Sequence, residues 1–454
     1  MKRESVLMFF CVIVCAVFFS GCTEAVTKET IDETNTDDET NTESVLVICS
    51  EQDYKSDIDI IIAAFEAQTG QKVDVEYIPP TYSFEGTPES ALKKRNTVVQ
   101  RIKTEMMAGE GPDLFLLPSY GSSAELFPDA LKTMSSGIFA DLSKYNEDFN
   151  ISQPILRAGQ YQTQQYIIPL GVRIPAFITS TELMSEINFN IDAAMKNAEA
   201  FLNELSIHPP LEGRFEIYSL VPFFSLLSED IMVDAEKQTV NLRTGYLETV
   251  LAYERSLYCE YSDSGEGIFA SPSAEKIYDG SRSFAFGMLG MTDMQFAAHD
   301  LLTSSADDFI VSLFPNEKGT TTAIVSGYAA VSANSSQIDA AIEFVKFILQ
   351  SQYQNAFVGT GASNFAGLPV NSEDIADYLM HNPRDITTEV ENEELYQQFK
   401  TVQEDIAQNI THARIPTVNE ALWNTAIIDN FASDSLMDEA LAKLEREFNL
   451  YITE

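Results

Sequence analysis

Apolar and polar residues alternate along the chain with the periods of strands and helices in turn. Residues 44–49, SVLVIC, form a near-continuous apolar run of strand length, the pattern of a strand buried on both faces of a parallel sheet. Residues 73–78, VDVEYI, alternate as a half-buried strand does, and residues 113–117, DLFLL, form another buried run. These three segments are predicted to be the first strands of the fold.

Helical periodicity fills the two intervals between these strands. Apolar side chains recur with helical spacing at Ile58, Ile61, Ile62 and Phe65 in the first interval and at Val98, Ile102 and Met106 in the second. Asp57 is a candidate N-cap of the first helix, and Gly70 and Gly109 stand where left-handed C-caps would end the two helices. Strands alternating with crossover helices predict an α/β layer whose ligand loops follow the strand ends, at residues 50–54 and 118–122.

The remaining chain holds extended segments and two further amphipathic helices. Residues 166–169 and 171–178 are predicted to be extended chain broken by prolines, followed by a helix or loop from Thr181. The two helices have apolar positions at Ile338, Ile342, Val345 and Ile348, within residues 335–350, and at Met437, Leu441, Leu444 and Phe448 near the C-terminus. The sequence shows no internal repeat and no second long hydrophobic span.

The N-terminus has the form of an export signal. Basic residues precede an apolar run over residues 5–19, which is too short to cross a bilayer comfortably and has the length of a signal-peptide core. The run closes with Phe-Ser-Gly-Cys, residues 19–22, which resembles the bacterial lipobox with phenylalanine in place of the usual leucine. The resemblance implies removal of residues 1–21 and attachment of lipid to Cys22. An ordinary signal sequence or a short membrane anchor is the alternative.

A polar, acidic tract links this signal to the rest of the chain. Residues 23–43 contain almost no large apolar side chain and carry many acids against the single base Lys28. Such a tract cannot bury enough apolar surface to offset the conformational entropy lost on ordering. We therefore expect residues 22–43 to form a solvated, lipidated tether and the globular body to start at Ser44.

The whole chain is strongly acidic. It has 69 Asp and Glu residues against 28 Lys and Arg residues, which gives a formal net charge of -41. Because phosphate contacts need clustered bases, this charge argues against a nucleic-acid partner, and solubility at a cell surface explains it sufficiently. About 410 residues follow the tether, which is enough for two domains.

Cysteine usage predicts no structural disulfide. Cys11 and Cys15 leave with the signal peptide and Cys22 is the expected lipid site, which leaves Cys49 and Cys259 in the body. Cys49 lies in the first predicted strand, where a small buried thiol is usual, so we expect no bridge between the last two.

Four stretches of the body, in order, resemble the extracellular solute-binding proteins of ABC importers, in the broad group of maltodextrin-binding and other sugar-binding proteins. They are MMAGEGPDLFLL, residues 106–117; QYIIPLGVRIPAFITSTELM, residues 165–184; residues 314–354; and NEALWNTAIIDNFASDSLMDEALAKL, residues 419–444. The first resembles the family's Pro-Asp approach to a strand. The second and third resemble its crossing strands, and the last resembles its C-terminal helical pair.

This resemblance implies a two-lobed α/β fold of the periplasmic-binding-protein type (type II), with the lobes joined by a hinge of crossing strands. The N-terminal lobe would comprise residues 44–172 and 327–371, and the C-terminal lobe residues 173–326 and 372–454. Gly171, Gly327 and Gly367 lie near the implied crossings, where the freedom of glycine in φ suits a hinge. Plain turn glycines are the alternative.

The same resemblance implies a function without chemistry. A small molecule, first of all an oligosaccharide or other carbohydrate, would be captured between the lobes and delivered to the transmembrane subunits of an ABC permease. This would take place at the extracellular face of a bacterial cell membrane, where the lipid holds the protein. Two alternatives stay open: the same fold used as a ligand sensor for a membrane receptor, and a surface glycan hydrolase.

Candidate ligand contacts come from the resemblance and from the strand ends. Trp423, the only tryptophan, matches a position where sugar-binding members place an aromatic side chain that stacks on a pyranose ring, with a core role as the alternative. Tyr54, Ser119 and Tyr120 follow predicted strands, where an open α/β sheet carries its ligand loops. For these three, an exposed loop position is the alternative.

Three further candidates lie near the implied crossings. Arg173 is a base in an otherwise apolar segment, placed either to bind an anionic solute bidentately or to pair with an acid across the hinge. Phe286 belongs to a Phe-rich and Met-rich segment that resembles part of the family's cleft lining, and Tyr328 follows a hinge glycine. Simple core packing is the alternative for Phe286.

Catalytic signatures are missing from the sequence. It contains no HExxH, GxSxG or P-loop motif, and its four histidines, His208, His299, His381 and His412, lack ligand spacing. A carboxylate pair for glycoside cleavage stays open in so acidic a chain, although nothing singles one out. We expect no catalytic residue, no metal site and no cofactor.

Overall fold

The structure is a computed structural model in which the following parts of the chain are described. They are residues 44–81, 86–119, 125–127, 130–186, 188–206, 215–217, 233–234, 239–243, 251, 284–290, 309–350, 367–371, 375–382, 385–389, 393–416 and 434–453.

The three predicted strands form a parallel layer. β1 (Leu46–Glu51) lies between β2 (Val73–Ile78) and β3 (Leu114–Pro118) and runs parallel to both. Apolar residues of β1 and β3 alternate between two cores, one on each face of the sheet. The near-continuous apolar runs are therefore explained by burial on both faces, as predicted.

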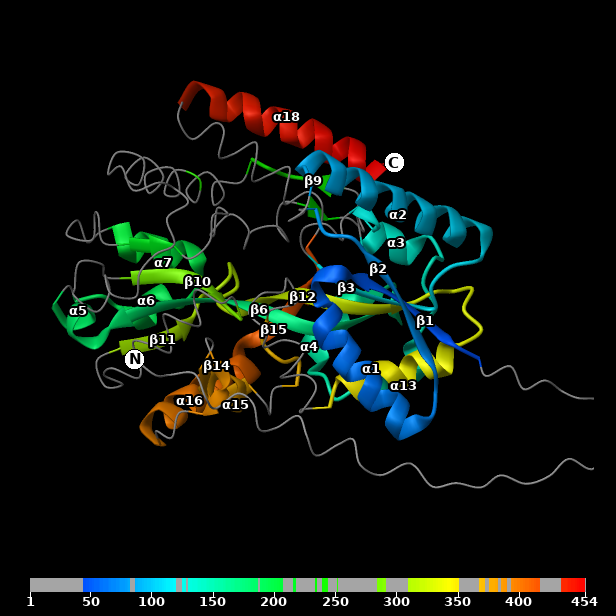
Figure 1. The fold of residues 1–454 in the computed structure, drawn as a ribbon. Coiled ribbons are helices and arrows are strands. Elements are labelled where there is room, and N and C mark those ends of the chain that lie inside the picture. Colours follow the sequence, from blue (N-terminus) through cyan, green and yellow to red (C-terminus); the bar gives the residue numbers. More distant parts are fainter. Residues whose placement is uncertain are drawn as a thin grey trace, which may run out of the picture. The chain divides into compact units, whose positions relative to one another are not determined.

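Helices cover both faces of this layer (Figure 1). α1 (Lys55–Thr69) and α13 (Ile338–Ile348) contribute to the core on one face, while α2 (Pro88–Ala108) and α3 (Ala130–Ser135) contribute to the core on the other. Phe65 packs edge-on against Phe344 and Phe347, with ring centroids 4.9 and 5.4 Å apart. These aromatic contacts join α1 to α13.

The predicted helix ends are confirmed at the C-caps and wrong at one N-cap. Gly70 and Gly109 both adopt φ of 78° and end α1 and α2 in the left-handed conformation. Asp57 does not cap α1, because a short 3-10 turn, η1 (Gln52–Tyr54), leads directly into the helix and makes Tyr54 the N-cap residue. Asp57 lies in the first turn, where its charge interacts favourably with the helix dipole.

Two long strands connect this layer to the rest of the sheet. β6 (Ile167–Ser180) and β12 (Thr321–Val331) are antiparallel, and β12 also pairs with β3. The extended chain predicted over residues 166–178 is confirmed, but the prediction that prolines break it is wrong. β6 runs through Pro169 and Pro175 without interruption. A proline removes only its own N–H from a ladder, and the carbonyl of Pro175 still accepts a hydrogen bond from Phe314 N (2.8 Å).

The sheet continues beyond β6. Its order is β2-β1-β3-β12-β6-β10-β7, with β11 also paired to β6 and β15 also paired to β12. These strands are β10 (Phe284–Leu289), β7 (Phe215–Ile217), β11 (Phe309–Leu313) and β15 (Ile410–Arg414). The first half of β6 pairs with β12 and its second half with β10 and β11, so one strand serves two groups of strands.

The other elements are short or lie around this sheet. They are η3 (Ser143–Asp148), α4 (Gln153–Leu156), η4 (Arg157–Gly159), β4 (Gln160–Tyr161), β5 (Gln164–Gln165), α5 (Thr181–Glu186), α6 (Ile191–Ala194), α7 (Ala198–Ser206), β8 (Val233–Asp234), β9 (Thr239–Val240), α15 (Ile375–Met380), β13 (His381–Asn382), β14 (Asp385–Glu389), α16 (Glu393–Asn409) and α18 (Asp434–Thr453). α5 is the predicted helix at Thr181. Within the described residues, no helix is both long enough and apolar enough to span a bilayer.

Burial confirms the predicted apolar faces of the late helices. Ile342, Val345 and Ile348 are buried in α13, and Leu441, Leu444 and Phe448 are buried in α18. The side chain of Met437 lies outside the described part. Cys49 is a free thiol with no exposed surface, as predicted for the first strand, and burial raises its pKa. Cys259 lies outside the described residues.

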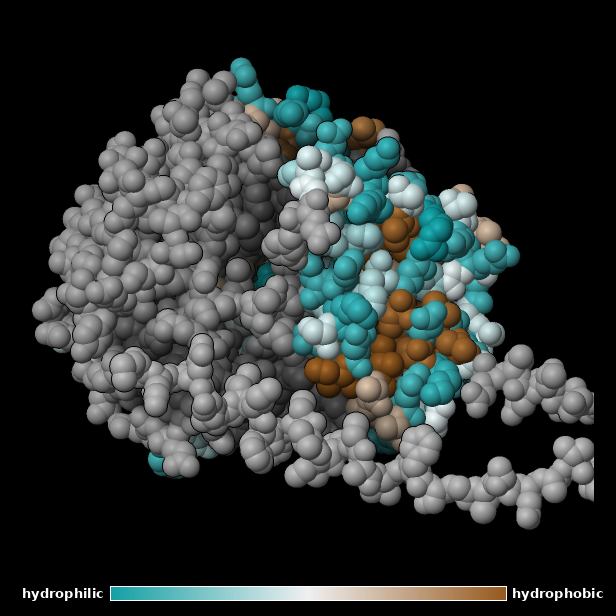
Figure 2. Space-filling model, viewed as in Figure 1, coloured by the Kyte–Doolittle hydropathy of each residue, from teal (hydrophilic) through white to brown (hydrophobic). Residues whose placement is uncertain are grey.

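The described surface is mixed in character (Figure 2). Figure 2 shows hydrophilic side chains interrupted by apolar patches. The large apolar side chains that are exposed are Val45, Ile60, Leu92, Met107, Ile138 and Leu450. Exposed apolar side chains of this kind are ordinary on protein surfaces, and they define no binding site by themselves.

Candidate functional site

The carboxyl ends of the parallel strands meet at one edge of the sheet. β1 ends at Glu51 and β3 ends at Pro118, and the hydroxyl of Ser50 donates a hydrogen bond to the Leu116 carbonyl oxygen (2.8 Å). Ser119 follows β3 directly. Open α/β sheets bind their ligands outside this edge, so these residues border the candidate site.

A buried guanidinium joins the ends of the three parallel strands. Arg95, in α2, has no exposed surface; its Nη1 and Nη2 donate to the two carboxylate oxygens of Glu51 at 2.7 and 2.8 Å. Nη1 also donates to the carbonyl of Pro79, just after β2 (2.6 Å), and Nε donates to Glu125 Oε2, beyond β3 (2.8 Å). One side chain therefore holds the chain that follows β2 and β3 against the last residue of β1.

The charge of this cluster follows from its hydrogen bonds. Burial by itself lowers the pKa of Arg95, but the hydrogen bonds and charges of Glu51 and Glu125 outweigh that effect and raise the pKa above its usual value. The guanidinium therefore stays charged. Charge-assisted bidentate contacts of this kind are the strongest and most directional hydrogen bonds available to an arginine.

The Arg95 cluster is not among the predicted sites, although the sequence contains a signal for it. Ala91, Arg95, Val99 and Ile102 recur at helical spacing on the buried face of α2. A charged residue in an apolar stripe has to find a partner, because an unpaired buried charge is very unfavourable. Spacing alone does not identify that partner, since Glu51 is 44 residues away in the sequence.

The three predicted hinge glycines come together in the structure. Gly171 of β6 and Gly327 of β12 are register partners in the antiparallel ladder. Gly367 precedes Leu368, which forms a bridge with Val172 through two backbone hydrogen bonds of 3.0 and 2.6 Å. Three segments far apart in the sequence therefore cross at one place.

Close backbone packing explains why Gly367 is a glycine. A Cβ added there would lie 2.4 Å from the Ser326 Oγ and 2.8 Å from the Val172 carbonyl oxygen. Gly290, with φ of 88°, lies against the same segment, and a Cβ there would approach the Leu368 nitrogen to 2.7 Å. Any side chain at these two positions would push the crossing segments apart.

Two buried hydroxyls at this crossing have no hydrogen-bond partner within the described part of the chain. Ser119 N donates to the Ser326 carbonyl (2.8 Å), which places the two serines next to each other across β3 and β12. Their hydroxyl oxygens are buried, and no described group hydrogen-bonds to either. A buried polar group without a partner costs about 1–3 kcal/mol, so such groups are rare and mark places where a ligand or a water molecule can bind.

The predicted tyrosine contacts lie deeper than expected. Tyr54 is 2% exposed and packs in the core beneath α1. Tyr328 is 4% exposed, packs in the same core as Cys49, and has its pKa raised by burial and by the nearby Cys49. Both rings contribute to the cores.

The other predicted contacts are only partly placed. Arg173 is partly buried in β6, in register with Ile324 of β12 and two residues beyond Gly171. Phe286 lies in β10, where its backbone is in register with Phe177. Tyr120, Trp423 and the lipidation candidate Cys22 lie outside the described residues.

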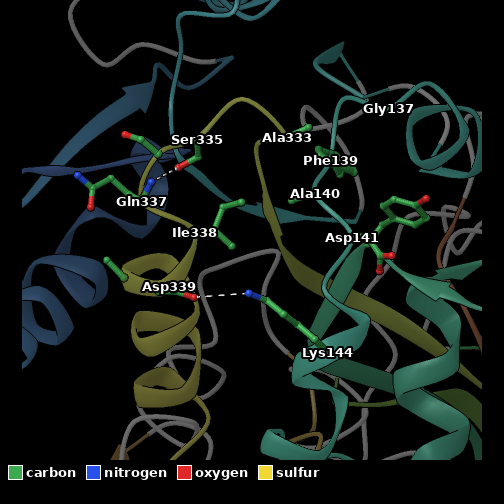
Figure 3. Close-up of a pocket in the computed structure, with 13 residues that line it drawn as sticks. Gly137, Phe139, Ala140, Asp141, Lys144, Ala333, Ser335, Gln337, Ile338 and Asp339 are labelled. Atoms are coloured by element: carbon green, nitrogen blue, oxygen red, sulfur yellow. Dashed lines mark hydrogen bonds and ion pairs between the residues drawn. The ribbon is translucent and has the colours of Figure 1, made fainter.

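A pocket of about 680 Å³ opens at a different place (Figure 3). It is lined by Gly137, Phe139, Ala140, Asp141, Lys144, Tyr166, Ala333, Ser335, Ser336, Gln337, Ile338, Asp339 and Ala340. Figure 3 shows Lys144 facing Asp339 at the start of α13, and their Nζ and Oδ1 atoms are 3.9 Å apart. Both side chains are well exposed, so this ion pair contributes little to stability.

This pocket and the candidate ligand edge lie at opposite ends of β3. Val331 is the last residue of β12 and precedes the pocket residues at 333–340; it is in register with Leu114, the first residue of β3. Gly327 is in register with Pro118, the last. With about 3.3 Å per strand residue, roughly 13 Å separates the two ends. The pocket is therefore separate from the edge where Ser119 and the Arg95 cluster lie.

Comparison with solved structures identifies the fold. No protein-family profile and no curated protein sequence matches the chain. An extracellular solute-binding protein of family 1 from Alicyclobacillus acidocaldarius is similar with a TM-score of 0.60 and 14% identity, over 90% of this chain and 99% of that chain. The sugar-binding protein MalE from Xanthomonas citri is similar with a TM-score of 0.58 and 13% identity, over 90% and 98%.

A third structure extends this comparison. An ABC substrate-binding protein from Listeria monocytogenes in complex with cycloalternan is similar with a TM-score of 0.52 and 16% identity, over 90% of this chain and 99% of that chain. The chain has the fold of the extracellular solute-binding proteins. The fold class predicted from the sequence, two-lobed α/β of the periplasmic-binding-protein type, is thereby confirmed.

Removal of the Arg95 charge is expected to destabilise this solute-binding fold strongly. In Arg95→Met, the Glu51 carboxylate stays buried without its partner, and the free energy of unfolding should fall by about 3–5 kcal/mol. Arg101→Met is the matched control on the same helix, because Arg101 is half exposed and should cost less than about 1 kcal/mol. Denaturant unfolding of both variants measures the difference. Equal and small losses of unfolding free energy in the two variants would show that the buried Glu51 carboxylate does not need Arg95 as its partner.

Gly367→Ala is expected to loosen the crossing. Its Cβ would overlap with Ser326 Oγ and the Val172 carbonyl, at a cost of about 1–3 kcal/mol measured by denaturant unfolding. Gly111→Ala, whose Cβ would meet only a Met106 side chain at 3.3 Å and backbone at 3.4 Å or more, should cost less. Adding Ser326→Gly to Gly367→Ala should recover part of the loss, because one of the two overlaps is removed. No recovery would contradict this account of the packing.

Proposed function

We propose that the protein is a lipid-anchored extracellular solute-binding protein that captures a carbohydrate, foremost an oligosaccharide, and delivers it to an ABC importer without chemical turnover. The observation that carries this proposal is the extent of the fold match. It covers 90% of this chain and 98% to 99% of the three solute-binding proteins. The match is therefore not confined to one α/β unit that many enzymes share.

Carbohydrate is the favoured ligand class for two reasons. The similar Xanthomonas citri protein is a sugar-binding protein, and the similar Listeria monocytogenes protein is in complex with cycloalternan. The edge beyond β3 also offers the hydroxyl of Ser119, which has no partner among the described residues and suits a sugar hydroxyl. A saccharide needs such polar contacts together with an aromatic face.

We assign the aromatic face to Trp423 and further contacts to Tyr120, Ser119, Phe286 and Arg173. The resemblance to the sugar-binding proteins supports Trp423 and Phe286, and the position beyond β3 supports Ser119 and Tyr120. Arg173 stands beside the crossing, where a charged group can reach a ligand held between the lobes. Tyr54 and Tyr328 would support the site from the cores in which they are buried.

The crossing at Gly171, Gly327 and Gly367 is the proposed hinge. A ligand that contacts both lobes only in the closed form shifts the open and closed populations by its difference in affinity for the two forms. The lobes proposed are residues 44–172 with 327–371 and residues 173–326 with 372–454. A permease would then recognise the closed form by its shape.

Attachment to the membrane completes the proposal. Cys22 would carry the lipid after removal of residues 1–21, and residues 22–43 would serve as the tether. Each buried CH₂ of an acyl chain contributes about 0.8 kcal/mol, and two chains hold a protein stably where one does not. This arrangement keeps the binding protein close to its permease at the extracellular face of the membrane.

Saccharide binding should be visible as thermal stabilisation of the purified protein. A ligand at 100 times its dissociation constant adds about 2.7 kcal/mol to the free energy of unfolding. The panel is maltotriose, cellotriose, raffinose, galacturonate and glucose 6-phosphate. Trp423→Ala should abolish a shift caused by a neutral saccharide, whereas Tyr166→Ala, which alters the pocket at the opposite end of β3, should preserve it.

Three other results would contradict this assignment of the saccharide site. Loss of the shift in Tyr166→Ala alone would place the saccharide in the pocket beside α13. A shift with the anionic solutes only, lost in Arg173→Ala, would overturn the neutral carbohydrate assignment. A cooperatively unfolding protein that no member of the panel stabilises would count against saccharide capture.

Lipid attachment should depend on the sulfur atom of Cys22. In Cys22→Ser, the sulfur that would form the thioether is replaced, so the protein should move from the membrane fraction to the soluble fraction of a bacterial host. Detergent phase partition of wild type and variant measures this change. Cys49→Ser is the control, since that thiol is buried in β1 and should leave partition unchanged. Membrane retention of Cys22→Ser would contradict the lipoprotein assignment.

A further inference from the structure

The Arg95 cluster leaves one carboxylate oxygen without a hydrogen bond from the described residues. Glu125 Oε2 accepts from Arg95 Nε at 2.8 Å, and Oε1 accepts no hydrogen bond from any described residue. The Glu125 side chain is 35% exposed, whereas the Glu51 side chain is 4% exposed and uses both of its oxygens for Arg95. The two carboxylates of the cluster therefore have different roles.

Glu125 brings a carboxylate charge to the exposed side of the cluster. Its ion pair with Arg95 is made through Oε2, and no other described base forms an ion pair with Glu125. The same guanidinium also serves Glu51, which accepts from Nη1 and Nη2. A partly exposed carboxylate fixed in this way can accept hydrogen bonds from hydroxyl groups and repels anions.

Its place in the fold directs this charge to the ligand edge. Arg95 ties Glu125 to the last residue of β1 and to Pro79 after β2, so Glu125 lies at the edge where the parallel strands end. Ser119, on the same edge after β3, has a buried hydroxyl without a described partner. An acceptor and a hydroxyl group therefore flank the same short connection, residues 119–125.

We propose that Glu125 is a ligand-contacting carboxylate that selects neutral saccharides over anionic ones. Its Oε1 accepts hydrogen bonds from saccharide hydroxyls and repels the carboxylate of a uronic acid or the phosphate of a sugar phosphate. Arg95 is a positioning residue, because it holds Oε2 and so orients Oε1. This inference rests on the proposed saccharide-binding function, and it decides between the neutral and anionic ligands that Arg173 left open.

The test measures charge discrimination by calorimetric titration of the full chain. Maltotriose, cellotriose and raffinose are titrated beside the forms of each that are oxidised at C6 to a uronate. Wild type should bind the neutral saccharide at least tenfold more tightly than its uronate. In Glu125→Gln, which keeps the size of the side chain and an acceptor for Arg95 Nε, affinity for the neutral saccharide should fall about tenfold and the discrimination should disappear.

The matched control is Glu105→Gln. Glu105 is 34% exposed and pairs with Arg101 within α2, so the variant removes an equally exposed carboxylate away from the strand ends. It should keep the affinities and the discrimination of wild type. The loss of discrimination separates a direct contact from a structural role, because mere distortion would weaken the neutral saccharide and its uronate alike.

Two results would overturn the inference, and they differ in what they leave standing. If wild type binds a neutral saccharide and Glu125→Gln keeps both its affinity and its discrimination, Glu125 is not a contact, while saccharide binding by this fold stands. If wild type binds none of the probes, the inference is overturned together with the proposed function.

Discussion

The buried guanidinium of Arg95 is the constraint on which the candidate site depends. It has no exposed surface and makes four hydrogen bonds, to Glu51, Glu125 and the carbonyl of Pro79. Enclosing an ion pair costs desolvation, so apolar groups of the same shape would give a fold of similar stability. The charged groups add directionality to these contacts. The planar guanidinium of Arg95 can donate to all of its acceptors only when the ends of β1, β2 and the chain beyond β3 are held in one arrangement.

The second constraint is the absence of side chains where the three segments cross. Gly171 and Gly327 are register partners, and Gly367 lies so close to Ser326 and Val172 that no Cβ fits. Backbone therefore approaches backbone closely where the sheet passes from one group of strands to the other. The proposed hinge lies in this region, and the buried hydroxyls of Ser119 and Ser326 lie beside it.

These two constraints divide the proposed function between them. The Arg95 cluster holds polar groups in place through four hydrogen bonds, which would reduce the ordering cost of binding. In the proposed function the glycine crossing is the hinge, and its change of shape would report binding to a permease. The pocket beside α13 belongs to neither, since it lies at the opposite end of β3 and is lined by an exposed ion pair.

The sequence by itself determined β1, β2, β3, α1 and α2, because their periods and the left-handed caps at Gly70 and Gly109 depend on residues a few positions apart. It also singled out Gly171, Gly327 and Gly367, and only the structure shows that the segments holding them meet. The remaining features depend on tertiary structure. Tyr54 is the N-cap residue of α1 in place of Asp57 because a short turn leads into the helix, and β6 continues through two prolines. The side chains of Tyr54 and Tyr328 lie in the cores. The partners of Arg95 lie 44 and 30 residues away from it, and such pairings are set by how the chain folds back on itself, which local pattern does not record.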